Sequence, residues 1–312
     1  MYLLGTLRSY RSSRRIIMSH WKLAALLAIC AGCTPQPQNV ANKPAPSAMA
    51  PSAIAPSEPA GSKSETGNAL KPLASGRFVD LSHPFDETTI YWPTEAGFVL
   101  ERGNNGVTPK GYYYAANRFR AAEHGGTHID APVHFSEGGH TVDQIELSRL
   151  IGEAVVIDVS AKCEQDRDYL IGVADLRAWE EEHHRQLVDV IVLLRTGWAK
   201  RWPDRKSYLG TEARGPDAVA ELHFPGLAPE AARWLVENRA PKAVGIDTAS
   251  IDYGQSTHFQ THVTLCEHNV PGFENVANLD ELPAEGVLVM ALPMKIAGGS
   301  GGPLRIVACV AP

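Results

Sequence analysis

The sequence lacks the features of several common protein classes. Its 312 residues include 35 acidic and 29 basic ones, and the region after residue 76 has no cluster of Lys or Arg, which argues against a nucleic-acid partner. It contains five cysteines, and those after residue 76 form no Cys-x-x-Cys pair, so neither a zinc ribbon nor a redox motif is indicated. No internal repeat or coiled-coil heptad is visible. We therefore expect a small-molecule partner.

The three cysteines of this region, Cys163, Cys266 and Cys309, are isolated in the sequence. A lone cysteine behaves as a small hydrophobic residue and is often buried. We expect all three to be buried, with one disulfide as the alternative in an oxidising compartment.

The apolar run Leu23–Ile29 is too short to span a bilayer. It follows several Arg and Lys residues and ends in Cys30-Ala-Gly-Cys33, a pattern that resembles a bacterial lipoprotein signal. We predict a signal peptide over residues 1–33, with Met18 as an alternative start, and lipid attachment at Cys33. The chain would then be exported and face the periplasm, held to the membrane through its lipid. Ordinary secretion with cleavage nearby is the alternative.

Residues 34–76 differ in composition from the rest of the chain. Pro, Ala, Ser and Asn dominate, and almost no aromatic or branched apolar residues are available for burial. We predict a disordered linker here. Residues 77–312 then form a single domain that is long enough to bury a full core.

This domain alternates strands and helices. Runs of branched apolar residues predict strands at 78–83, 154–159, 188–194, 243–247 and 287–292. Apolar residues at helical spacing predict helices at 172–183 and 229–238. Such alternation indicates an α/β domain with a mixed sheet.

Four side chains able to bind or assist a metal lie in one short segment, His124-Gly-Gly-Thr-His128-Ile-Asp130-Ala-Pro-Val-His134. The two glycines after His124 make a regular helix costly, so a tight turn leading into a strand is predicted. On that strand His128 and Asp130 would face the same side, because they are two residues apart. Pro132 limits the strand, and His134 returns near the site.

Two imidazoles and a carboxylate suit Zn²⁺ or Mn²⁺, whereas Ca²⁺ and Mg²⁺ prefer more oxygen ligands. Such a site leaves positions open for water or substrate. A metal acidifies its bound water, and a nearby histidine can take the proton. On spacing alone, the alternative is a structural turn that happens to contain histidines.

The segment also resembles the His-x-Gly-Thr-His-x-Asp-x-Pro-x-His signature of the cyclase family, which includes bacterial kynurenine formamidases and isatin hydrolases. The resemblance extends from Phe78 to Pro312 through four further stretches: Asp80–His83, Arg195–Gly197, Gly245–Asp252 and Glu274–Asp280. It implies the swivelling β/β/α fold of that family. It also implies metal-dependent hydrolysis of a C–N bond in a small aromatic amide or lactam, similar to formylkynurenine or isatin.

The resemblance assigns roles to particular residues. It implies His134 as the acid/base and one or two Zn²⁺ or Mn²⁺ ions as cofactor. The second ion would share Asp130 with the first. The implied metal ligands are His124, His128, Asp130, His262 and Glu274.

Several nearby residues compete for these roles. His258, His262 and His268 lie in one stretch, and His262 is preferred because its distance from Glu274 matches the formamidase pattern. It also precedes the helix-like run 263–266. We expect His258 to face the substrate and His268 to lie on the surface. For Glu274, a charge at a helix start is the alternative.

Two further sets of residues have alternative interpretations. Trp92 would stack on a flat aromatic substrate, with ordinary core packing as the alternative. Asp247 and Asp252 follow a buried strand at the end where α/β sites open. For both we expect the structural role of ordering a loop.

In the expected reaction, water activated by the metal attacks the carbonyl, and His134 moves a proton to the leaving nitrogen. No serine nucleophile is expected. An isatin-like lactam is at least as good a candidate as formylkynurenine, because an exported enzyme fits poorly with a cytoplasmic pathway. The alternative from another class is a periplasmic metal- or ligand-binding lipoprotein without turnover. The resemblance also implies a homodimer or homotetramer, in which loops of a neighbour close the pocket.

Overall fold

The computed structural model describes residues 75–311. The predicted signal peptide, the predicted lipid attachment at Cys33 and the linker up to residue 74 lie outside the described residues. Within the described part, no helix is both long enough and apolar enough to cross a membrane.

The domain consists of twelve strands, six α-helices and five short 3₁₀ segments over the described residues. The strands are β1 (Arg77–Asp80), β2 (Val99–Val107), β3 (Tyr113–Arg120), β4 (His128–Asp130), β5 (Ile151–Asp158), β6 (Leu170–Ile171), β7 (Ile191–Arg195), β8 (Gly226–Leu227), β9 (Ala243–Ile246), β10 (Gly272–Glu274), β11 (Val287–Pro293) and β12 (Gly301–Val310). The α-helices are α3 (Leu147–Leu150), α4 (Ser160–Gln165), α5 (Val173–His183), α6 (Arg205–Leu209), α7 (Pro229–Asn238) and α8 (Gln260–Glu267). The 3₁₀ segments are η1 (Pro132–His134), η2 (Val142–Gln144), η3 (Ala199–Arg201), η4 (Pro216–Glu221) and η5 (Leu279–Glu281).

An eight-stranded mixed sheet organises the domain, in the order β1-β12-β11-β5-β7-β9-β10-β4. Strand β12 also pairs with β4, so the sheet closes on itself like a barrel. The neighbours β5–β7, β7–β9 and β9–β10 are parallel, whereas β12, β11 and β4 pair with their neighbours in antiparallel fashion. The prediction of an α/β domain with a mixed sheet is confirmed.

The central strands are apolar throughout because both of their faces are buried. In β7, Ile191 and Leu193 belong to the core enclosed by the sheet. The alternate residues Val192 and Leu194 pack toward the helices. This explains why the sequence shows continuous apolar runs rather than a polar–apolar alternation.

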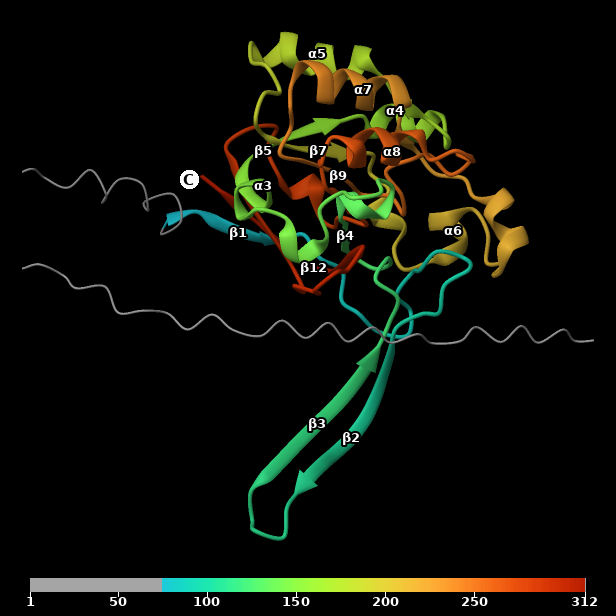
Figure 1. Cartoon of the computed structure of the whole chain (residues 1–312), viewed down its shortest axis with the longest axis vertical. Coiled ribbons are helices and arrows are strands. Elements are labelled where there is room, and N and C mark those ends of the chain that lie inside the picture. Colours follow the sequence, from blue (N-terminus) through green and yellow to red (C-terminus); the bar gives the residue numbers. More distant parts are fainter. Residues whose placement is uncertain (1–74, 312) are drawn as a thin grey trace, which may run out of the picture. The chain divides into compact units, whose positions relative to one another are not determined.

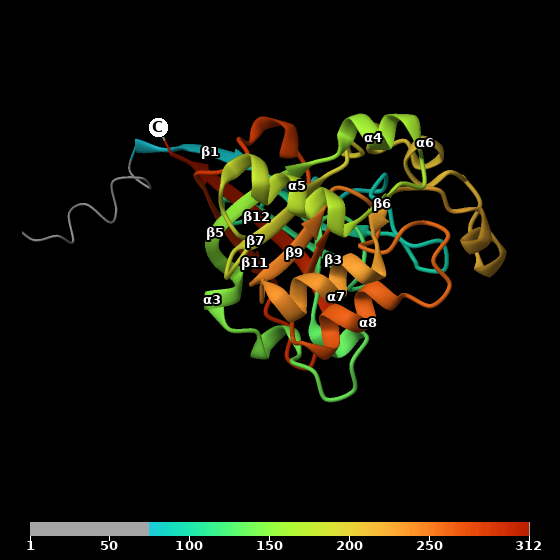
Figure 2. The same ribbon diagram turned by 90° about the horizontal axis from the view of Figure 1, so that it is seen from above.

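Helices α5, α7 and α8 cover the outer face of β5, β7 and β9 (Figures 1 and 2). Helix α7 occupies the predicted residues 229–238 and begins with a proline at its first position, where no backbone donor is lost. It packs Ala231, Ala232 and Leu235 against the second core. Helix α5 matches its prediction to within one residue.

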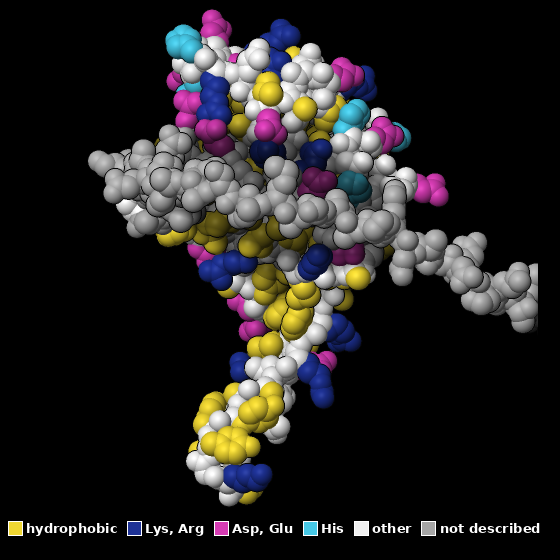
Figure 3. Space-filling view, turned by 60° about the vertical axis from the view of Figure 1, so that its left-hand side comes forward, with side chains coloured by type: hydrophobic (Ala, Val, Ile, Leu, Met, Phe, Trp, Pro, Cys, Tyr) yellow, Lys and Arg dark blue, Asp and Glu magenta, His cyan; other side chains and the backbone are white. Residues whose placement is uncertain are grey.

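A two-stranded hairpin, formed by β2 and β3, projects far from the sheet (Figure 1). Every residue of β2 is exposed, and β3 has a single partly buried residue. The exposed side chains include large apolar ones, of which Val107 is 73% and Tyr113 64% accessible. Figure 3 shows this apolar surface along the arm. The sequence patterns had predicted no strands in this stretch.

Candidate metal centre

A tight turn leads from His124 into β4. Gly126 has φ +58° and Gly125 has φ +154°, conformations that side chains rarely adopt. A Cβ on Gly125 would collide with the Tyr91 ring, and one on Gly126 would lie 2.6 Å from the Phe85 ring. Both glycines are therefore needed to bring His124 beside the strand that follows it.

Strand β4 carries His128 and Asp130 on one face, as their spacing predicts. It lies between β10 and β12, and its register places Glu274 of β10 directly opposite His128. Helix α8 adds His262 from the neighbouring layer. His262 was expected just before this helix, but it lies in the first turn, because the helix starts at Gln260. Glu274 lies in a strand rather than at a helix start.

The first of two clusters consists of His124, His128 and Asp130. Asp130 Oδ1 lies 2.7 Å from His124 Nδ1 and 3.2 Å from His128 Nε2. The other ring nitrogens are held from behind: His128 Nδ1 lies 2.9 Å from Gly126 O, and His124 Nε2 lies 3.0 Å from Ser300 Oγ. Both imidazoles thus turn one nitrogen toward the same carboxylate oxygen.

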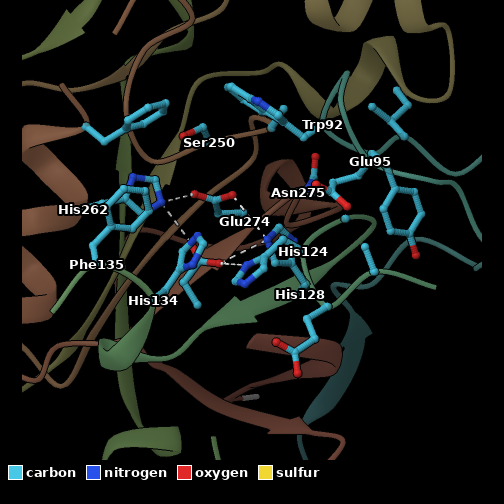
Figure 4. Close-up of a pocket in the computed structure, with 18 residues that line it drawn as sticks. Trp92, Glu95, His124, His128, His134, Phe135, Ser250, His262, Glu274 and Asn275 are labelled. Atoms are coloured by element: carbon cyan, nitrogen blue, oxygen red, sulfur yellow. Dashed lines mark hydrogen bonds and ion pairs between the residues drawn. The ribbon is translucent and has the colours of Figure 1, made fainter. Parts of the chain in front are cut away.

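The second cluster consists of Asp130, His262 and Glu274. His262 Nε2 lies 3.1 Å from Asp130 Oδ2 and 3.1 Å from Glu274 Oε1. The other oxygen of Glu274 lies 3.4 Å from His128 Nε2. Asp130 therefore directs one oxygen at each cluster. The two oxygens of Glu274 likewise face His262 and His128, and Figure 4 shows Glu274 between these histidines.

The donor set fits a divalent cation at either cluster. Atoms that share one ion through bonds of about 2.0–2.2 Å are separated by roughly 3 Å, which matches these distances. Electrostatics agree: although burial raises the pKa of Asp130, the neighbouring histidines hold it well below its usual value. Burial and the charge of Asp130 raise the pKa of Glu274. Two buried carboxylates this close call for positive charge between them.

The histidines respond in the same way to these carboxylates. Burial opposes a charge on His128, but the carboxylate of Asp130 outweighs it and raises the pKa to about 9. His262 behaves alike, since its three carboxylate neighbours overcome burial and lift its pKa well above the usual value. The same negative charge that favours a proton on these imidazoles would attract a bound cation, which would take the place of the proton. The residues present therefore suit a divalent metal. Water or substrate would fill the remaining coordination positions.

His134 lies in η1, beside both clusters. Its ring stacks on His124 with the centroids 3.8 Å apart and meets the edge of His262 at 5.9 Å. Burial and the neighbouring histidines lower its pKa to about 4, against the opposing pull of Asp130. A neutral imidazole at this position is able to accept a proton.

The clusters form the floor of a cavity of about 350 Å³. Trp92, Phe135 and Phe259 line its apolar walls. Two carboxylates, Glu95 and Glu123, also line it. Figure 4 shows Trp92 above the histidine ligands and Phe135 next to His262. Such a cavity accommodates a small flat molecule whose polar group faces the metal ligands.

The other predicted residues have mixed outcomes. Trp92 lines the cavity and also packs against the small core around Trp198. Its stacking on a substrate stays a prediction. His258 is exposed and lies outside the cavity lining, where its neighbour Phe259 takes part instead. His268 is exposed, as expected. All three cysteines are buried, as expected.

The two aspartates after β9 differ from each other. Asp247 has the expected structural role, accepting hydrogen bonds from the backbone N–H and hydroxyl groups of Thr196 at 2.8 and 2.5 Å. Asp252 orders its loop and also touches a predicted metal ligand, because Oδ2 lies 2.6 Å from His262 Nδ1. The sequence did not suggest this second contact.

Sequence reasoning also missed Asn275 and Tyr208. The Asn275 amide donates to Gly126 O at 2.8 Å, the same oxygen that His128 Nδ1 meets. The hydroxyl of Tyr208 donates to Asn275 Oδ1 at 2.9 Å. Together these residues support His128. Asn275 directly follows Glu274, so its place beside the site had a local signal, whereas Tyr208 had none.

Ser300, His124 and Asp130 line up in the order of a serine-hydrolase triad. No serine nucleophile was expected, yet Ser300 lies within Gly298-Gly-Ser-Gly-Gly302, which fits the Gly-x-Ser-x-Gly spacing of such enzymes. However, the motif precedes a strand rather than a helix, and the Ser300 hydroxyl donates to Glu123 Oε2 at 2.6 Å. Ser300 is also not among the described residues that line the cavity. The serine supports His124 and does not face substrate.

The closed mixed sheet and the paired ligand clusters at one end of a cavity define the class: a metal-dependent hydrolase of α/β type. The family model described as "Putative cyclase" matches residues 79–253, more than half of the chain. The chain therefore belongs to the cyclase family, as its signature indicated.

Relatives within this family include characterised hydrolases. The isatin hydrolase of Roseibium aggregatum is 35% identical over 64% of this chain and 76% of its own length. The kynurenine formamidase of Bacillus cytotoxicus is 27% identical over 75% of this chain and 98% of its own. The solved structure of isatin hydrolase A from Labrenzia aggregata, bound to benzyl benzoate, superposes with a TM-score of 0.70. It is 34% identical, and the match covers 80% of this chain and all of that one.

Proposed function

We propose that the protein hydrolyses a C–N bond in a small, neutral, aromatic lactam or amide of the isatin type. The observation that carries this proposal is the pair of ligand clusters sharing Asp130 on the floor of an aromatic cavity, with His134 beside them. A divalent ion bound there, Zn²⁺ or Mn²⁺, would polarise the carbonyl and acidify water. Two relatives, an isatin hydrolase and a kynurenine formamidase, carry names that fit this chemistry.

The residues of the chain itself provide positioning and proton transfer. Trp92 and Phe259 hold a flat ring by apolar contact, with the carbonyl facing the clusters. His134 accepts the proton of the attacking water and returns it to the leaving nitrogen. Its lowered pKa keeps the imidazole neutral before the reaction.

The charge of the cavity favours a neutral substrate over an amino acid. Among the described residues that line it there is no Lys or Arg, whereas Glu95 and Glu123 contribute carboxylates. Formylkynurenine carries an α-ammonium, which Glu95 and Glu123 suit, and an α-carboxylate, which would find no partner there apart from the metal. Isatin has no such group.

Purified protein supplied with Mn²⁺ or Zn²⁺ is to be compared on isatin and on formylkynurenine. We expect kcat/KM to be at least about tenfold higher for isatin, which corresponds to about 1.4 kcal/mol. An equal or higher value for formylkynurenine would contradict the neutral-substrate proposal, while leaving amide hydrolysis intact.

A rival proposal is a binding protein that holds metal without turnover. His134 argues against it, because a metal store needs no histidine stacked beside its ligands. If the protein binds metal but turns over no member of a broad panel of amides, lactams and lactones, the binding proposal wins.

The triad-like line of Ser300, His124 and Asp130 provides a second candidate, a serine hydrolase. The two proposals differ sharply for Ser300→Ala. Loss of a serine nucleophile costs about 10⁶-fold in kcat, whereas loss of a hydrogen bond to His124 costs about 10–100-fold through metal affinity. A loss that is restored by excess metal supports the metal mechanism.

We also propose that the chain acts as a homodimer whose hairpin arm, β2 and β3, packs on a second copy. An isolated two-stranded hairpin is at best marginally stable in water, yet this one exposes Tyr112, Tyr113 and Phe119 by 56, 64 and 53%. Outward-facing apolar side chains on such an arm are typical of an interface.

Finally, we propose that the protein is exported and anchored by a lipid at Cys33. The support is the sequence pattern alone, since these residues lie outside the described part. Labelling with a radioactive fatty acid is expected in the wild type and absent in Cys33→Ala. An unlabelled wild type would contradict the anchor.

A further inference from the structure

The two ligand clusters differ in what holds their histidines from behind. In the first cluster, His128 is backed by a peptide carbonyl and His124 by a hydroxyl. In the second, His262 Nδ1 lies 2.6 Å from a carboxylate oxygen of Asp252. A carboxylate partner fixes the tautomer and raises the basicity of the nitrogen that faces the metal. The second cluster therefore has a stronger support than the first.

Asp252 has four partners, all of which order the region around His262. Besides the ring, Oδ2 accepts from the His262 backbone N–H at 3.1 Å, and Oδ1 accepts from Thr261 N at 3.3 Å and Ser256 Oγ at 3.0 Å. The N-cap residue of α8, Phe259, provides no side-chain cap. Asp252 thus caps the helix from a distant turn and orients the ring with the same carboxylate.

The residue before Asp252 holds the other ligand. The backbone N–H of Ile251 donates to Glu274 Oε1 at 2.7 Å, and this is the oxygen that faces His262. The turn is itself anchored, since Leu227 N donates to Ile251 O at 2.8 Å. A Cβ on Gly226 would collide with the backbone of Asp252 and Tyr253, so the strand segment β8 lies directly against it.

We propose that the turn of Ile251 and Asp252 determines whether a second ion is held, with Asp252 as the positioning residue for His262. The turn fixes two of the three second-cluster ligands, one by a backbone donor and one by a carboxylate. The first cluster receives no contact from these two residues among those described. The inference rests on the proposed metal centre, but not on the identity of the substrate.

Asp252→Asn is the test variant, because the amide keeps the size of the side chain and removes its charge. Metal-free protein is titrated with Mn²⁺ and separately with Zn²⁺, and bound ions per chain are counted by elemental analysis and calorimetry. We expect two ions in the wild type. In Asp252→Asn the affinity of one of them falls about 10–100-fold, while the other keeps its affinity.

Ser256→Ala serves as the matched control. It removes a hydrogen bond from Oδ1 of Asp252 and leaves the contact between Oδ2 and His262, so both ions are expected to stay. Equal loss of the second ion in this variant would show that loop order alone matters, and would overturn the role of Asp252. Equal weakening of both ions in Asp252→Asn would overturn it too.

A measurement on the wild type keeps the proposal testable even if Asp252→Asn does not fold. The short contact predicts a strongly downfield proton NMR signal for His262 Nδ1–H, assigned by its loss in His262→Gln. During the metal titration, this signal is expected to shift only when the added ion occupies the second cluster. Its absence, or a wild type that saturates with one ion, would overturn the inference and leave the proposed hydrolase standing. A wild type that binds no ion would instead contradict the proposed function.

Discussion

The metal centre and the hairpin arm are opposites within one domain. Asp130, His128 and Glu274 are at most 4% accessible, and each has partners within the chain. The strands of the arm expose nearly every residue and pair only with each other. The exposed apolar side chains of the arm contribute nothing to the core of the described chain. The buried His128, Asp130 and Glu274 are instead arranged around a site that suits a cation.

The difference is also energetic. Burying a carboxylate is costly unless it is paired or coordinates a metal. The buried carboxylates of the centre therefore favour binding of a cation. For each exposed tyrosine of the arm, contact with another apolar surface would instead be favourable in free energy, because it removes apolar area from water. We therefore expect the centre to respond mainly to ions, and the proposed dimer contact of the arm to respond mainly to protein concentration.

The largest expected effect comes from Asp130→Asn, because Asp130 is the one residue common to both clusters. We expect kcat/KM to fall at least about 10⁴-fold, since a bound metal would lower the activation barrier by several kcal/mol. Hydrolysis followed by absorbance and metal content by elemental analysis would both report it. The control is Asp217→Asn on the exposed surface of η4. A fully active Asp130→Asn would contradict the metal centre.

His134→Ala is expected to reduce kcat about 10²–10⁴-fold, the range for loss of a general acid/base. Unlike Asp130→Asn, it should leave the number of bound ions unchanged, because His134 belongs to neither ligand cluster. His268→Ala, at the exposed end of α8, is the matched control. An unchanged kcat would remove His134 from the mechanism.

Removing the metal is expected to destabilise the part of the domain built on the closed sheet and to leave the hairpin arm unchanged. A free ion concentration of 100 times the dissociation constant stabilises the folded state by about 2.7 kcal/mol. Chelation should therefore lower Tm, and added Mn²⁺ or Zn²⁺ should restore it. Hydrogen exchange would report the stability of the two regions separately. If Tm is the same in metal-free protein and at saturating metal, a buried ion is contradicted.

The smallest effect on folding is expected from Tyr113→Ser at the exposed arm. In dissociated protein, the free energy of unfolding should change by less than about 0.5 kcal/mol, whereas self-association measured by sedimentation should weaken. Phe273→Ala provides the contrast, since this fully buried side chain lies on β10 opposite Ile129 and belongs to the core enclosed by the sheet. Its loss should cost about 3–5 kcal/mol. Unaltered association in Tyr113→Ser would count against the arm as a dimer contact.

Much of the closed sheet and its helices could be predicted because their sequence patterns are local. Strands β5, β7, β9 and β11 are apolar runs, and α7 has helical spacing with proline at its start. The two-residue spacing of His128 and Asp130 on a strand was also a local property, and β4 confirms it. The arm was missed because neither face of β2 is buried, so its sequence carries no alternating pattern.

The sequence by itself determined the family, the class of chemistry and the short segment from His124 to His134, because spacing along a turn and a strand sets which side chains point together. Only the tertiary structure determined what stands behind those side chains. Ser300 lies 176 residues from His124 along the chain, and Asp252 comes from a different turn than His262. Such contacts arise when the sheet closes between β4 and β12 and when α8 docks beside β9. The contact of Ser300 with His124 joins segments distant in sequence, so no local pattern encodes it. Asp252 and His262 are only ten residues apart, but the geometry of their contact depends on how the turn packs against β8 and α8.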